Sequence, residues 1–191
     1  ASLTPGSRLE KGSRRDNPIH HLTLLAKNAE GYRNLMRLAS IAHLEGFHYK
    51  PRIDYEALAA HKDGLIVLSG CLNGEISQHL LHGRDEEAKR VALRLHEMFG
   101  DDFYLEIQDH GMLEQKKVTA GAIRLSGETG IPLVATNDVH YLRPEDAALQ
   151  EVLICIGTGK TIEDEDRMKV VTNQNYLKSA EEMAALFPHV P

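Results

Sequence analysis

The sequence predicts an α/β fold in which helices cover a parallel sheet or barrel. Short apolar runs at residues 64–68, 102–108 and 131–136 lie between turn residues, as strands buried on both faces do. The segments between these runs carry apolar residues at helical spacing. Strands that alternate with helices at such intervals are typical of βα units, whose strands run parallel.

Helices in the first half are marked by residues that favour helix N-termini. Asn28 is a predicted N-cap, and Glu30 falls in the first turn, where the helix dipole favours an acidic side chain. Asp54 is the predicted cap of a shorter helix. The expected elements are, in order, a loop at 1–18, a strand at 20–27, a helix at 28–46, a short helix at 54–61 and the strand at 64–68.

The second half contains similar signals. Asp85 is a predicted cap, Pro144 suits a first helical turn, and Ser179 with Glu182 forms the pattern of a capping box. Gly130 follows the helix that precedes the last strand. Helices are therefore expected at 75–81, 85–99, 113–129, 144–156 and from 179 onward, with irregular chain at 157–171.

Composition narrows the class of protein. The 191 residues carry a net charge of −6, so the chain as a whole does not attract nucleic acid electrostatically. Its apolar runs are all shorter than the ~18–20 residues of a membrane span. The two cysteines, Cys71 and Cys155, provide no disulfide framework, and we therefore expect a cytoplasmic protein. The polar start and the abrupt end suggest a piece of a longer chain.

A carboxylate and an imidazole follow the run at 131–136. If the chain is still extended there, Asp138 and His140 point to the same side, because alternate side chains of a strand share a face. Catalytic and binding residues collect where the strands of parallel sheets and barrels end. The two side chains would then form half of a metal site.

Three further residues could complete that site. Cys71 and His110 follow the two preceding strands, and His21 lies in the strand at 20–27. Each has an ordinary structural alternative: Cys71 as a small buried apolar residue, His21 as a core histidine and His110 as part of a turn. Together, His, Cys and Asp suit zinc or a similar divalent ion, and paired ions suit phosphoester hydrolysis.

Several stretches are similar to one known family. HLTLLAKNAEGYRNLMRLAS, KPRIDYEAL, GLIVLSGCLNGEI, FYLEIQDHG, EQKKV, IPLVATNDVHY and the tail FPHVP occur in this order. They resemble the PHP (polymerase and histidinol phosphatase) domain of bacterial DNA polymerase III alpha subunits, which are replicative polymerases. The resemblance covers residues 19–191, which would be the C-terminal part of that domain.

The resemblance implies a distorted (βα)7 barrel and a metal cluster. His21, Cys71, Asp138 and His140 would be metal ligands, and His110 would lie near the cluster without being a ligand. The ions would be zinc, manganese or magnesium. The family's opening His-x-His pair, and the Asp, His and Glu that follow, do not occur here. The barrel would thus lack its N-terminal strands, and the downstream palm, fingers and thumb of the polymerase are absent too.

For the full subunit, the resemblance implies DNA-templated DNA synthesis during replication. Its partners would be primer–template DNA, the sliding clamp and a proofreading exonuclease, with no membrane involved. In this segment, the PHP domain would bind metal and act as a 3′→5′ exonuclease, although the isolated piece is expected to be inactive. The alternatives are an inactive PHP scaffold that binds a separate exonuclease and a free-standing PHP phosphoesterase.

Overall fold

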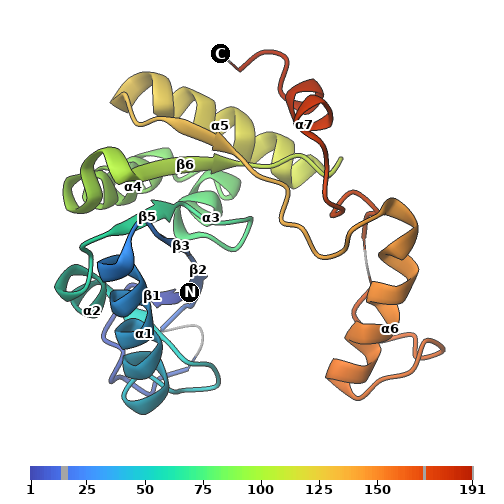
Figure 1. Cartoon of the computed structure of the whole chain (residues 1–191), viewed down its shortest axis with the longest axis horizontal. Coiled ribbons are helices and arrows are strands. Elements are labelled where there is room, and N and C mark those ends of the chain that lie inside the picture. Colours follow the sequence, from blue (N-terminus) through green and yellow to red (C-terminus); the bar gives the residue numbers. More distant parts are fainter. Residues whose placement is uncertain (14–16, 170, 191) are drawn as a thin grey trace.

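The computed structural model describes residues 1–13, 17–169 and 171–190. Figure 1 shows helices packed around strands, with α6 standing apart from them. The strands are β1 (Ser2–Thr4), β2 (His20–His21), β3 (Thr23–Ala26), β4 (Ile53–Asp54), β5 (Leu65–Leu68), β6 (Phe103–Ile107) and β7 (Leu133–Ala135). The helices are α1 (Ala29–Leu44), α2 (Tyr55–Ala60), α3 (Glu75–Leu81), α4 (Asp85–Phe99), α5 (Leu113–Thr129), α6 (Ala147–Thr158) and α7 (Ala180–Leu186). Two short 3-10 helices, η1 (Gly100–Asp102) and η2 (Pro144–Asp146), precede β6 and α6.

The α/β class is confirmed, but the sheets are mixed. Within the described residues the strands form two open sheets, of order β2-β1-β4 and β3-β5-β6-β7. The β5–β6 and β6–β7 pairs are parallel, as predicted, whereas β3 is antiparallel to β5, with Thr23 opposite Leu68. Between β3 and β5 the chain passes through α1, β4 and α2, and β5 then pairs with β3 in the opposite direction. A closed seven-unit barrel is not formed by these strands.

The predicted loop at 1–18 contains a strand. Ser2–Thr4 forms β1, which pairs with β2 and β4, and Leu3 and Thr4 are buried. Three residues with one apolar side chain are too short to show a strand's periodicity, so only long-range pairing reveals it. The predicted loop residues 14–16 lie outside the described part of the chain.

The last strand is less buried than predicted. β7 covers only Leu133–Ala135 and forms one edge of the four-stranded sheet. Its residues are half-buried or exposed, and of the predicted apolar run only Ile131 is fully buried. An apolar run does not distinguish a central strand from an edge strand, because its neighbours are supplied by distant sequence.

The helix boundaries follow the capping residues closely. The Asn28 side chain accepts hydrogen bonds from the N–H groups of Glu30 and Gly31, and Asp54 accepts one from Ala57. The predicted capping box of Ser179 and Glu182 is present. Arg84, not Asp85, occupies the N-cap position of α4.

The core lies between the four-stranded sheet and helices α1 to α5. Phe103, Leu105 and Val67 on the strands pack with Leu38 of α1 and Leu95 of α4. None of the described helices is long and apolar enough to cross a membrane.

Candidate metal centre

Three of the predicted ligands meet at one cavity. His21 ends β2, Cys71 follows β5 by three residues, and Asp138 follows β7 by three residues. All three line a cavity of about 670 Å³, together with Lys50 and the buried Glu106. Because β5, β6 and β7 are parallel neighbours, their C-terminal ends lie at the same end of the sheet, which explains why residues distant in sequence converge there.

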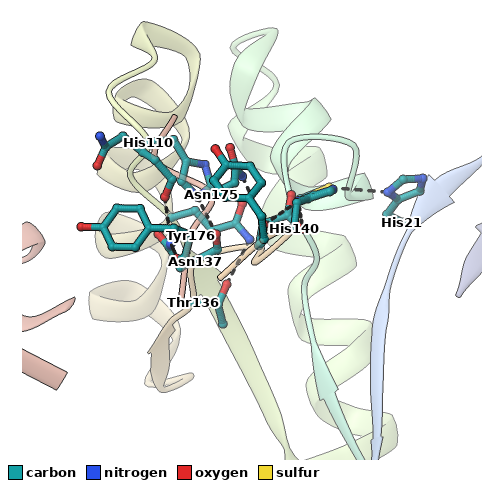
Figure 2. A network of polar contacts seen from close by, with 12 residues as sticks. His21, His110, Thr136, Asn137, His140, Asn175 and Tyr176 are labelled. Carbon is teal, nitrogen blue, oxygen red and sulfur yellow. Dashed lines mark hydrogen bonds and ion pairs between the residues drawn. The ribbon is translucent and has the colours of Figure 1, made fainter. Parts of the chain in front are cut away.

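The closest pair is Cys71 and His21. The Cys71 sulfur lies 3.5 Å from Nδ1 of His21, and Figure 2 shows the imidazole ring turned toward that sulfur. Two ligands of one tetrahedral zinc ion, at bond lengths of about 2.3 Å to sulfur and 2.0 Å to nitrogen, have donor atoms roughly 3.5 Å apart. The pair therefore has both the chemistry and the spacing of two ligands to one ion.

Burial favours the neutral forms of both groups. It raises the pKa of the Cys71 thiol, and the nearby carboxylates of Asp138 and Glu106 act in the same direction. Burial also lowers the pKa of His21, assisted by the positive charge of Lys50. Without a metal ion, the 3.5 Å contact is thus a weak hydrogen bond between a thiol and a neutral imidazole.

Asp138 takes an uncommon backbone conformation. Its φ of 44° lies in the left-handed region, which Asp tolerates better than most residues other than glycine. The strand has already ended at Ala135, so the chain is not extended through Asp138. The extended chain that would point Asp138 and His140 to the same side is therefore not formed, although the Asp138 side chain still reaches the cavity.

His140 is held beside the cavity by its own loop. Its Nδ1 lies 2.6 Å from the backbone carbonyl oxygen of Asp138, so Nδ1 carries the proton and donates it. Its ring is about half exposed and is not among the residues that line the cavity. A hydrogen bond from Nδ1 to a backbone carbonyl leaves Nε2 free as a lone-pair donor, which is a common arrangement in metal-binding histidines.

His110 is buried and has both ring nitrogens engaged. The Gln115 amide accepts from the backbone N–H of His110 and donates to its Nδ1 at 2.6 Å. Nε2 then carries the proton and donates to the carbonyl oxygen of Asn137 at 2.7 Å. His110 therefore supports the backbone next to Asp138, and its nitrogens are not free to bind a metal ion.

Asn137 connects this loop to a later segment. Its side-chain amide donates to the carbonyl oxygens of Gln174 and Tyr176, and the N–H of His140 donates to Asn175. Figure 2 shows His110, Asn137, Asn175 and Tyr176 as one connected group. The position of Asp138 thus depends on residues far along the chain, which sequence spacing gave no means to predict.

The described residues provide part of a metal site. Among them, no three His, Cys, Asp or Glu side chains are arranged to hold one ion. The His21–Cys71 pair fits two ligand positions, Asp138 lines the same cavity, and His140 would have to turn its ring toward it. Glu106 was missed by sequence reasoning, although a carboxylate inside the apolar run FYLEI was a visible signal.

The chain belongs to the PHP domain family, whose model matches residues 6–110. The resemblance to bacterial DNA polymerase III alpha subunits is also confirmed. The chain is 49% identical over 191 residues to the DNA polymerase III subunit alpha of Treponema pallidum, covering 99% of this chain and 16% of that protein. It is 48% identical over 181 residues to that of Helicobacter pylori strain J99 (90% and 15%) and 48% identical over 182 residues to that of Thermus aquaticus (94% and 15%).

The chain therefore spans only about 16% of the length of such a relative. The matched stretch includes every predicted ligand in the Treponema comparison, since 99% of the chain is covered.

Proposed function

We propose that this chain is the PHP domain of a DNA polymerase III alpha subunit and works in DNA-templated DNA synthesis. The observation that carries the proposal is the 49% identity that extends over 99% of the chain. Such identity over nearly the whole chain also disfavours the alternative of a free-standing PHP phosphoesterase. In this proposal, the partners of the complete subunit are primer–template DNA, the sliding clamp and a proofreading exonuclease.

Within that subunit, we propose that this domain binds divalent metal and removes 3′-terminal nucleotides as an exonuclease. His21, Cys71, Asp138 and His140 would hold the ions, which would be zinc, manganese or magnesium. Divalent ions supply positive charge for a phosphodiester and make water more acidic. The mixed nitrogen, sulfur and oxygen donors, and the 3.5 Å spacing of the closest pair, support this assignment.

The residues around the ligands suit a phosphodiester substrate. Lys50 lines the same cavity and brings a positive charge to the side of His21. Leu24, Leu35 and Leu38 provide an apolar part of the same wall. A positive charge beside a bound phosphate stabilises the negative charge that develops there during hydrolysis.

A second function, an inactive scaffold, has one observation in its favour. The described residues bring no three potential ligands together around one point. In this reading, the domain supports the polymerase and binds a separate proofreading exonuclease, while His21 and Cys71 form only a weak polar contact with each other.

Metal analysis of the full-length gene product distinguishes the two functions. The exonuclease proposal predicts stoichiometric divalent metal and metal-dependent loss of 3′-terminal nucleotides from labelled single-stranded DNA. Cys71→Ala and Asp138→Asn should each lower the metal content, whereas Cys155→Ala, at a buried cysteine that does not line the cavity, should not. Metal at background level in the wild-type protein would leave the scaffold as the function.

The gene sequence beside this domain tests the proposed polymerase subunit itself, because that subunit requires an encoded polymerase palm.

A further inference from the structure

Glu106 is a buried carboxylate in the middle of β6. Only 7% of its surface is exposed, and the neighbours Leu105 and Ile107 belong to the core. A carboxylate in such surroundings is costly unless hydrogen bonds replace its water. The groups that donate hydrogen bonds to Glu106 therefore indicate the role of this carboxylate.

Four uncharged donors surround the two oxygens of Glu106. Oε2 accepts from the backbone N–H of Gly70 at 3.0 Å and from the Thr23 hydroxyl at 3.4 Å. Oε1 accepts from the Thr136 hydroxyl at 2.5 Å and from the Gln108 amide at 3.1 Å. An ionised carboxylate has about four lone-pair positions, so these donors occupy its accepting capacity. Glu106 is thus arranged to hold protein groups in place, not to coordinate an ion.

Three of the donors stand next to the candidate ligands. Thr23 lies two residues after His21, Gly70 immediately precedes Cys71, and Thr136 lies two residues before Asp138. The donors come from β3, from the turn after β5 and from the end of β7, and no backbone pairing joins β3 to β7. One side chain therefore links the three segments that carry His21, Cys71 and Asp138.

We propose that Glu106 is a positioning residue that sets the relative placement of His21, Cys71 and Asp138. The inference rests on the proposed metal centre and adds a residue that coordinates nothing itself. Without the carboxylate, the N–H of Gly70 would be buried without an acceptor, and the turn that carries Cys71 would move independently of Thr136. Gly70 also lies close to the strand that carries His21, because a Cβ on Gly70 would come within 2.4 Å of the His21 carbonyl oxygen.

Cobalt binding to the metal-stripped, full-length gene product tests this role. Co²⁺ bound to a thiolate gives a near-ultraviolet charge-transfer band, so the spectrum reports Cys71 coordination as well as affinity. Glu106→Gln keeps the size of the side chain but cannot accept at both ends. It should weaken Co²⁺ binding about 10–100-fold, as loss of groups that orient metal ligands commonly does, and should weaken the charge-transfer band. Thr136→Val, which removes one of the four hydrogen bonds, should have a smaller effect in the same direction.

Asn34→Ala is the matched control for a general loss of stability. Asn34 is also buried and polar, but its amide donates to the Asp63 carbonyl oxygen, away from the cavity. This variant should be destabilised while keeping wild-type cobalt affinity and spectrum. Wild-type cobalt binding by Glu106→Gln, or a loss no larger than that of Asn34→Ala, would overturn the proposal.

A metal-free measurement separates this inference from the metal centre itself. The alkylation rate of Cys71 in metal-stripped protein, followed on its peptide by mass spectrometry, should rise severalfold in Glu106→Gln because the turn after β5 is released. If wild-type protein bound no cobalt, the metal-centre proposal would fail. The alkylation rate would then decide the role of Glu106, and an unchanged rate would refute it.

Discussion

The part of the chain before residue 136 and the part after it differ in how much of their apolar surface is buried. Residues up to 135 surround one core, and every fully buried residue of that core lies between Leu3 and Ile131, whereas Phe187 and Val190 pack against it only partly buried. In the described residues after 135, only Asn137 and Cys155 are buried, and α6 stands away from the sheet (Figure 1). We refer to these parts as the body (residues 1–13 and 17–135) and the arm (residues 136–169 and 171–190).

Helix α6 makes the contrast clear. Leu149, Val152, Leu153 and Ile156 recur at the spacing of one helical face, and all four are exposed. Helix α4 of the body shows a similar stripe, and its Ala88, Ala92 and Leu95 are buried. An apolar stripe thus predicts a helix correctly in both regions, but it does not say which surface, if any, covers the stripe.

The largest expected effect is in the body. Leu95→Ala removes a leucine that is only 2% exposed, so it should lower the free energy of unfolding by about 2–5 kcal/mol. Urea denaturation followed by circular dichroism measures this loss. A change below about 1 kcal/mol would mean that the core around α4 is not closely packed.

An intermediate effect is expected within the body, where Arg8 of the N-terminal segment contacts Asp54 at the start of α2. Burial alone would raise the pKa of the Asp54 carboxyl group, but hydrogen bonds from the N–H groups of Arg8 and Ala57, and the Arg8 guanidinium, outweigh it and lower the pKa. A carboxyl group with a lowered pKa stabilises the fold above its unfolded value of about 3.9 and loses that contribution as the pH falls through its folded value.

Asp54→Asn keeps a good helix cap but removes the charge. It should therefore cost about 1–2 kcal/mol at pH 7, where the bonds to Arg8 are charge-assisted. The difference from wild type should shrink as the pH falls below about 4. Denaturation curves across this range provide the measurement, and a difference independent of pH would show that the Asp54 charge is not responsible.

The smallest expected effect is in the arm. Leu153→Ala makes the same chemical change as Leu95→Ala, also within a helix, but Leu153 is 61% exposed. Its unfolding free energy should change by less than about 0.5 kcal/mol. A loss as large as that of Leu95→Ala would remove the distinction between body and arm, because it would require α6 to be covered in solution.

What the sequence predicted well was local. Asn28, Asp54 and Ser179 cap their helices because a capping side chain bonds to N–H groups two or three residues away. The direction of β3, the strand at Ser2–Thr4 and the edge position of β7 depend on pairing across long stretches of chain. No local pattern carries that information.

In the candidate site, too, some features could be predicted from the sequence and others could not. Predicting that His21, Cys71 and Asp138 lie together needed only strand ends and a family resemblance, and all three line one cavity. The orientation of His140 could not be predicted, because it follows from the left-handed backbone at Asp138 and from a hydrogen bond to that residue's own carbonyl oxygen. Neither this backbone conformation nor this hydrogen bond can be recognised from the spacing of residues in the sequence.

The hydrogen bonds between residues 137–141 and 172–177 have a consequence for how this protein can change over evolution. The Tyr141 hydroxyl donates to the Thr172 carbonyl oxygen, and the Tyr141 carbonyl oxygen accepts from the N–H of Leu177. The two ends of the segment that carries α6 are therefore held together. A segment whose two ends are fixed side by side can be lengthened, shortened or exchanged at little entropic cost. The length and surface of the outer part of the arm can thus change during evolution without moving the loop that carries Asp138.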